Sequence, residues 1–396
     1  MLCFLWENKG MDKDILILGA GPAGLSTALH LARNYPHLAT RVRVLDKARH
    51  PRPKLCAGGL VIDAEVILER LGLDVDEVPH VDASAAHFDF AGKGLSVRNP
   101  KRHTLRVIRR DEFDAWLAGK VREQGIEISE GVTVKNVIPD SEGVTVETDQ
   151  GNFRAQFVIG ADGSNGVSRR CVLPNEPVHT ARVLEVLTPE PVERDGIPPH
   201  ETNHAYFDFF CVPIGIAGYT WDFPTQIKGQ PMRCWGIYDM NIIADQKRPP
   251  LKETLSAEMS RHGFDLSQYE IKGHPIRWFD PFNKICVPRV LLVGDAAGAD
   301  PLFGEGISMA LGYGNVAAHE IGAAFQRGDF SFNGYRRRVL KDALGQTLIA
   351  RWFIAQVVYT LKWKWFQILL WRVLKPFVLI AAWLFVLNWG LRQRTK

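Results

Sequence analysis

A glycine-rich turn near the start of the chain places strong limits on its fold. The apolar run 14–18 leads into Gly19-Ala20-Gly21-Pro22-Ala23-Gly24, and helix-forming, largely apolar residues follow over 25–32. A second apolar run, 42–45, ends at Asp46, about 20 residues after the turn. Short apolar runs of this kind are typical of central strands buried on both faces. The order of strand, glycine turn, helix, strand and acid is the dinucleotide-binding fingerprint.

The physical role of this turn is to hold a pyrophosphate. Gly19 allows the tight turn, Gly21 lets the backbone approach the phosphates, and Gly24 permits close packing of helix on strand. The N-terminus of the helix then faces the phosphates, and the acid accepts hydrogen bonds from a ribose. A carboxylate there disfavours NADP, whose 2′-phosphate it would repel. The alternative is that the glycines serve packing alone. The cofactor-binding residues predicted in this region are Gly19, Gly21, Ala23, Gly24, Asp46 and Lys47.

Composition and cysteine spacing exclude several classes of protein. The 396 residues, 46% hydrophobic and 23% charged, suffice for one large or two ordinary domains with substantial cores, so a disordered chain is excluded. The six cysteines are widely separated and form no CxxC pair, so we expect neither a metal site nor a disulfide framework. A reducing compartment is the expected location.

The last part of the chain differs in composition from the rest. From residue 343 onward there is no acidic residue, the charge is +8, and six of the eleven tryptophans lie there. Basic side chains interleaved with Trp, Leu and Phe suit a membrane interface, and no nucleic-acid partner is expected. The longest apolar run, 376–391, would reach roughly 24 Å as a helix, short of the roughly 30 Å of a hydrocarbon core.

We therefore predict that region 331–396 is a helical tail that lies in or dips into a membrane surface. The alternative is a helical layer packed on the body or on a second subunit, and the missing acidic residues argue against it. The apolar run 2–6 is short and charged residues follow it, which does not fit a signal peptide. The expected location is the cytoplasmic face of a membrane, as a peripheral or monotopic protein.

Three later segments resemble motifs of one flavoprotein family. The run 157–169, which contains Gly160-Ala161-Asp162-Gly163, resembles the GADG segment of the para-hydroxybenzoate-hydroxylase-like flavoproteins. The run 289–307 resembles their second FAD motif, and 107–117 resembles their R..FD..L element, with Arg109 beside Arg110 leaving the register open by one residue. The resemblance implies FAD as the cofactor. It also implies FAD contacts for Arg110, Asp162, Gly163, Asp295, Gly304, Gly306 and Ile307.

Two more segments resemble the geranylgeranyl reductases, flavoenzymes that saturate isoprenoid double bonds. The run 53–59, Pro-Lys-Leu-Cys-Ala-Gly-Gly, resembles their PxKxCGG segment, with Ala57 as a departure. This implies that Ala57 and Gly58 approach the isoalloxazine and that Cys56 is catalytic near its reactive face. The alternative is that Cys56 is a small buried hydrophobe.

The second of these segments, 218–224, resembles the YxWxFP pattern of the same reductases. The resemblance implies that Tyr219, Trp221 and Phe223 form a wall that faces substrate. Such a wall suits a polyprenyl chain, because both are apolar. The alternative is that these residues form the packed core of a sheet.

The expected fold class is α/β, with two interleaved domains before the tail. A Rossmann-like FAD-binding domain is discontinuous over 11–171 and 286–330. An antiparallel-sheet substrate domain takes 84–103 and 172–285, where aromatic-rich candidate strands occur.

Taken together, these features predict an FAD-dependent oxidoreductase that reduces carbon–carbon double bonds of a polyprenyl lipid. The reductant would be NADPH, NADH or ferredoxin, and the sequence does not identify which. Two alternatives stay open. One is an FAD-dependent monooxygenase or epoxidase that acts on a lipophilic substrate. The other is a membrane-held flavoprotein that relays electrons or is not catalytic.

Overall fold

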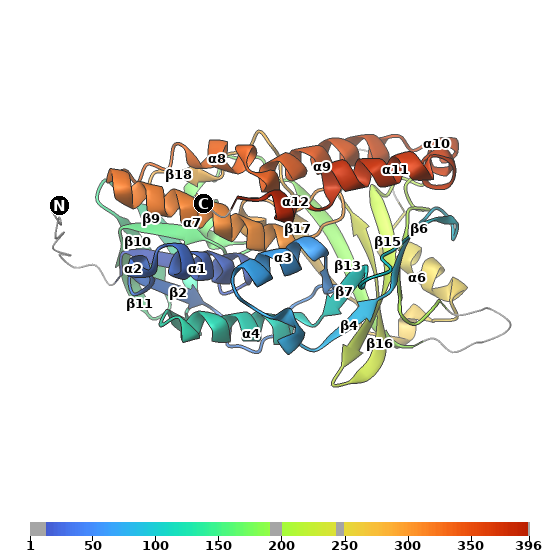
Figure 1. The fold of residues 1–396 in the computed structure, drawn as a ribbon, viewed down its shortest axis with the longest axis horizontal. Helices are drawn as coiled ribbons and strands as arrows, with labels where there is room; N and C mark the ends of the chain where they lie inside the picture. Colours follow the sequence, from blue (N-terminus) through green and yellow to red (C-terminus); the bar gives the residue numbers. More distant parts are fainter. Residues whose placement is uncertain (1–12, 191–199, 243–248, 395–396) are drawn as a thin grey trace.

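The computed structural model describes residues 13–190, 200–242 and 249–394. Its first layer is a six-stranded sheet in the order β18-β19-β12-β1-β2-β8, in which the edge strand β18 pairs antiparallel and the other pairs are parallel (Figure 1). The central strand β1 is completely buried, as its apolar run predicts. The strands are β1 (Ile15–Leu18), β2 (Val42–Asp46), β8 (Glu127–Glu130), β12 (Phe157–Gly160), β18 (Cys286–Val287) and β19 (Val290–Leu292).

The glycine turn connects β1 to helix α1 (Pro22–Asn34), which packs along α7 (Ile307–Arg327). A Cβ on Gly24 would lie 2.0 Å from the carbonyl oxygen of Gly19, so only glycine allows the helix to start this close to the strand. Around this layer lie a three-stranded sheet and further helices. They are β9 (Val134–Pro139), β10 (Val144–Thr148), β11 (Gly151–Ala155), α2 (Pro36–Ala39), α3 (Ile62–Arg70), α4 (Arg110–Glu123) and α5 (Val167–Val172).

The second layer is a seven-stranded sheet in the order β17-β13-β16-β15-β14-β5-β6. Its pairs are antiparallel except β14 with β5, which run parallel, so the expectation of an antiparallel sheet is wrong at this pair. The reason is that β5 enters from a distant part of the chain instead of through a hairpin. The strands are β5 (Ala85–Asp89), β6 (Gly94–Arg98), β13 (Thr180–Pro189), β14 (His204–Asp208), β15 (Gly218–Ile227), β16 (Gln230–Asp239) and β17 (Lys272–Arg277).

A small sheet joins the two layers. Strand β7 lies between β3 and β4 and leads directly toward α4, so it connects the second layer to the first. Helix α6 packs on β16 at the far side of the second layer (Figure 1). The bounds of these elements are β3 (Gly59–Leu60), β4 (His80–Ala83), β7 (Leu105–Ile108) and α6 (Leu251–Arg261).

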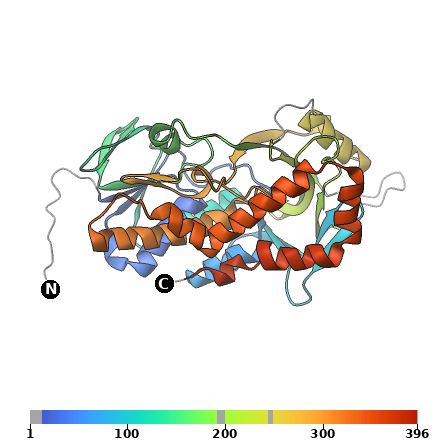
Figure 2. The ribbon, with the colours of Figure 1, turned by 90° about the horizontal axis from the view of Figure 1, so that it is seen from above.

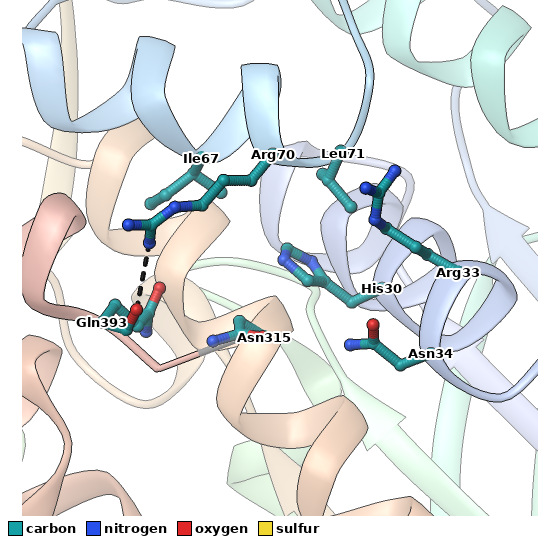
Figure 3. Close-up of a pocket in the computed structure, with 8 residues that line it drawn as sticks. All are labelled: His30, Arg33, Asn34, Ile67, Arg70, Leu71, Asn315 and Gln393. Carbon is teal, nitrogen blue, oxygen red and sulfur yellow. Dashed lines mark hydrogen bonds between the residues drawn. The ribbon is translucent and has the colours of Figure 1, made fainter. Parts of the chain in front are cut away.

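After α7 the tail runs along one edge of the molecule, turns, and returns (Figures 1 and 2). Its last turn docks on α3, where Arg70 donates to the carbonyl oxygens of Gly390 at 2.6 Å and Gln393 at 3.0 Å (Figure 3). The tail consists of α8 (Tyr335–Lys341), α9 (Ala343–Thr360), α10 (Lys364–Ile368), a π-helical turn Leu369–Val373, α11 (Lys375–Ala381), a second π-helical turn Ala382–Val386 and α12 (Trp389–Arg392).

The tail packs on the body through an inner face. The missing acidic residues of the tail were expected to argue against such packing, and that expectation is wrong. Arg351 of α9 is 1% exposed and pairs with Asp300 and Glu305, which the body supplies. Trp389 is completely buried. By length and composition Lys375–Arg392 could cross a membrane, but the chain bends within it at Asn388, where φ is 60°.

Candidate functional site

One cavity of about 1320 Å³ lies between the carboxyl ends of the parallel strands and one face of the seven-stranded sheet. Ligands bind in this crevice in doubly wound sheets, and the volume exceeds the roughly 300–1,000 Å³ of ordinary small-molecule sites. The cavity is lined by all but one of the residues predicted from the sequence: Gly19, Gly21, Ala23, Asp46, Lys47, Cys56, Ala57, Gly58, Arg110, Asp162, Gly163, Tyr219, Trp221, Phe223, Asp295, Gly304, Gly306 and Ile307. The exception is Gly24, which lets α1 pack closely against β1.

The fingerprint residues form one end of the cavity. The carboxylate of Asp46 ends β2 and is fixed by the backbone N–H of Ala20 at 2.6 Å and of Ala48 at 2.7 Å. A Cβ on Gly21 would meet nothing closer than Arg52 Nη2 at 3.7 Å, so open space lies in front of this backbone. The residues present therefore fit a dinucleotide, with a bare backbone for the pyrophosphate and a held carboxylate for the ribose.

Two acids of the later FAD-motif segments, around the middle of the cavity, are also held in place. Asp162 accepts hydrogen bonds from the backbone N–H and the hydroxyl of Ser168, and burial raises the pKa of its carboxyl. Asp295 accepts a hydrogen bond from Ser164 Oγ at 3.2 Å. Both carboxylates can still accept further hydrogen bonds, because each oxygen can accept more than one.

Arg110 and Cys56 lie together beside these acids. Arg110 lines the cavity and Arg109 does not, which favours Arg110 in the register left open by the sequence. Its guanidinium makes a two-pronged pair with Asp114 at 2.8 and 2.9 Å. The Cys56 side chain interacts with Arg110, and its Sγ accepts from the backbone N–H of Gly58 at 3.4 Å. Cys56 is partly exposed to the cavity, so it is not the buried hydrophobe of the alternative interpretation.

The wall opposite the fingerprint is aromatic. Tyr219, Trp221 and Phe223 face the cavity from alternate positions of β15 and are at most 6% exposed. A Cβ on Gly236 of β16 would lie 2.0 Å from the Trp221 ring, so this glycine leaves room for the indole. The aromatic side chains are thus both the packed core of the sheet and the lining of the cavity.

The loop 301–306, which belongs to the second FAD motif, is tied to both the sheet and the tail. Tyr238 donates to the carbonyl of Pro301 at 3.0 Å, and Tyr219 donates to that of Phe303. From the tail, Arg351 donates to Asp300 Oδ2 at 2.8 Å and to Glu305 Oε2 at 2.7 Å. The tail therefore fixes the position of this loop.

Sequence reasoning gave no role to several titratable side chains that line the cavity, and four of them matter here: Lys54, Glu185, His274 and Arg351. Burial lowers the pKa of His274 to about 4, with Lys54 and Arg110 adding to the effect, and leaves its Nδ1 without a partner. Burial also lowers the pKa of Lys54 and raises that of Glu185 to about 7. Of these four residues, only Lys54 belongs to a segment that the sequence analysis recognised, the one that contains Cys56. The other three lie on a strand or helix face that spacing alone does not orient.

Comparison with known proteins bears directly on this site. Residues 12–207 match the family model of the FAD binding domain. The chain is 27% identical over 346 residues to digeranylgeranylglycerophospholipid reductase 3 of Methanosphaera stadtmanae, covering 81% of this chain and 80% of that protein. The chain is an FAD-dependent oxidoreductase similar to the digeranylgeranylglycerophospholipid reductases. The FAD cofactor and the family resemblance predicted from the sequence are thereby confirmed.

Two further relatives cover nearly the whole of this flavoprotein. An uncharacterized protein of Methanosarcina barkeri is 28% identical over 347 residues, which are 87% of this chain and 84% of that protein. The crystal structure of a geranylgeranyl bacteriochlorophyll reductase-like protein from Thermoplasma acidophilum superposes with a TM-score of 0.75, 21% identity, and coverage of 96% and 98% of the two chains. The mixed α/β FAD-binding fold is therefore shown, whereas the FAD contact of each individual residue stays a prediction.

Proposed function

We propose that this flavoprotein reduces carbon–carbon double bonds in a polyprenyl lipid. The observation that carries the proposal is the single cavity that joins the FAD-motif residues to the aromatic wall of Tyr219, Trp221 and Phe223. A cofactor and a long apolar chain can share one enclosed space there. The relative from Methanosphaera stadtmanae, whose name denotes reduction of a polyprenyl glycerophospholipid, supports the same class of reaction.

Bound FAD, once reduced, supplies a hydride equivalent. The residues of this chain then have two tasks. The aromatic wall excludes water and holds the alkene, and a side chain must supply the proton for the second carbon. An isolated alkene is a poor hydride acceptor, so a positioned proton donor is needed for the reaction. Cys56 lines the cavity at the segment implied to face the isoalloxazine, and we propose it as a catalytic residue that contacts the alkene there, a role separate from that of the proton donor.

The test of this function is mass spectrometry of geranylgeraniol after incubation with dithionite-reduced protein, with and without oxygen. Products that gain pairs of hydrogen atoms without oxygen support the reductase. A product that gains one oxygen atom only in air would establish the monooxygenase alternative. An unchanged lipid under both conditions, with FAD bound, would favour the electron-relaying alternative.

A single substitution separates the proposed role of Cys56 from that of the cavity as a whole. Cys56→Ser should lower turnover about 10- to 100-fold, because a more strongly hydrated hydroxyl replaces the thiol beside the alkene, and FAD should stay bound. Cys171→Ser is the matched control, since Cys171 is a partly buried thiol on α5 that does not line the cavity. Equal turnover of the two variants would remove Cys56 from the mechanism.

We also propose that the tail holds the protein on the cytoplasmic face of a membrane. Its outer face exposes large apolar side chains, among them Trp363, Trp365, Phe377 and Trp383, each 58% to 69% exposed. The +8 charge from residue 343 onward supports attraction to anionic lipids. The inner face is packed on the body, which favours lying on the surface over crossing it. The unpaired cysteines of the described chain agree with a reducing compartment.

A further inference from the structure

One acidic side chain in the cavity has no evident structural task. Among the described residues, six acidic side chains line the cavity: Asp46, Asp63, Asp162, Glu185, Asp295 and Glu305. Hydrogen bonds from backbone N–H groups, from serine hydroxyls or from Arg351 hold five of them. The sixth is Glu185, which is 6% exposed and whose Oε2 has no hydrogen-bond partner. A buried polar atom without a partner is costly, so it needs an explanation.

The position of Glu185 places its carboxyl in the apolar wall. It lies on β13, directly opposite Gly236 of β16, which has no side chain. The Trp221 ring fills the space over that glycine. Glu185 also interacts with the backbone N–H of Cys56. The carboxyl therefore lies between the proposed substrate wall and the segment that contains the proposed catalytic cysteine.

The tyrosines and the histidine of the wall are engaged in hydrogen bonds or are very weak acids near neutral pH. The hydroxyls of Tyr219 and Tyr238 donate to carbonyl oxygens of the loop 301–306, and burial raises both phenol pKa values far above the ordinary one. His274, with its lowered pKa, is neutral near pH 7. These groups are poor sources of a proton.

We propose that Glu185 is the proton donor for the alkene reduction, an inference that rests on the function proposed above. One alkene carbon gains a hydride equivalent from reduced FAD, and the other gains the proton of the Glu185 carboxyl. The π bond is lost and two C–H bonds form, so the alkene is reduced by two electrons and FAD is oxidised by two. Glu185 is left as a carboxylate and takes a proton from solvent, and an external two-electron donor reduces FAD again.

The charged and titratable groups around Glu185 suit this role. Burial raises the pKa of its carboxyl to about 7, while Arg109, the backbone N–H of Cys56, Lys272 and Cys234 all act in the opposite direction. Near neutral pH the carboxyl is therefore partly protonated. A catalytic acid works best when its pKa lies close to the working pH, because it can both give and regain its proton.

The first test measures the proton of Glu185 without substrate. Infrared difference titration of the FAD-loaded protein should show a carboxyl C=O band that disappears with a midpoint near pH 7. Glu185→Gln should lack this band. Glu147→Gln, a change on β10 outside the cavity, should keep it. Burial also raises the pKa of Asp63 and Asp89 to about 6, so the band of Glu185 is the part of the signal that Glu185→Gln loses. No loss on that substitution, or no band in the wild type, would overturn the proposal.

The second test follows the reaction. Glu185→Gln has nearly the same shape and cannot donate its amide proton, so geranylgeraniol reduction should fall about 10²- to 10⁴-fold with FAD still bound, and Glu147→Gln should match the wild type. Unreduced geranylgeraniol with wild-type protein would contradict the proposed function itself. Wild-type rates in Glu185→Gln would contradict only the role of Glu185.

Discussion

The buried carboxyl of Glu185 carries a folding cost that depends on pH. Its pKa is 4.5 in a model compound and about 7 in the folded protein. The folded state therefore binds the proton more tightly, and stability falls as the pH rises from 4.5 through 7. The total loss is about 3 kcal/mol, at about 1.36 kcal/mol per pKa unit. Glu185→Gln stays neutral, so above pH 7 it should be more stable than the wild type by up to this amount.

Urea unfolding of the wild type and the variant, above pH 7 and below pH 4.5, measures this difference. The gain should appear only on the alkaline side, since below pH 4.5 both side chains are neutral in the folded and unfolded states. Glu147→Gln controls for the loss of a glutamate as such. A gain that is equal at both pH values would mean that packing, and not ionisation, sets the cost.

Glu185 also shows which site residues could not be predicted from the sequence. The glycines of the turn and Asp46 were predictable, because their chemistry follows from spacing within one continuous segment. Glu185 was not, because whether a strand position faces a cavity depends on its register with strands from elsewhere in the chain. His274, on the neighbouring strand β17, was missed for the same physical reason.

Among the elements, α9 links the tail to the loop 301–306 through one side chain. Arg351 is buried, and its two terminal nitrogens donate to Asp300, Glu305 and the carbonyl of Val386. Removing the cation leaves the buried Asp300 and the partly buried Glu305 without a counter-ion, and breaking a buried ion pair in this way costs about 3–5 kcal/mol. Arg351→Met should therefore lower the free energy of unfolding by that amount and weaken retention of FAD, because the loop loses its support.

Urea unfolding and the flavin absorbance that remains after gel filtration check this prediction. Lys364→Met, which removes an exposed cation of the same tail, is the matched control and should change neither. If Arg351→Met keeps both stability and flavin, the ion pairs do not position the loop. The sequence predicted helices in this region, but not that one of its basic residues points inward, since its partners lie about 50 residues away in the chain.

For the molecule as a whole, the tail combines two roles. Its inner face supplies Trp371, Val378 and Ala382 to the wall of the cavity, and its outer face exposes tryptophan and phenylalanine. Trp383 belongs to both, since it lines the cavity and is 64% exposed. If the outer face lies on a bilayer, a lipid chain reaches the cavity without crossing water. The composition of the tail predicted the apolar outer face, whereas its share in the cavity required the fold.

The last prediction tests this surface directly. The combined change Trp363→Ser, Trp365→Ser and Phe377→Ser removes three exposed rings, each worth about 1.5–3 kcal/mol when fully buried. Even partial insertion of these rings implies a loss of affinity of at least about 100-fold for vesicles that contain phosphatidylserine. Ile138→Ser with Val178→Ser, two exposed apolar residues outside the tail, should leave binding unchanged.

Cosedimentation with vesicles is the measurement, and added salt should weaken wild-type binding because the basic residues contribute. Equal sedimentation of all three proteins would exclude the tail as the membrane contact, and an unbound wild type that doubles its mass in light scattering would assign this face to a second copy of the chain.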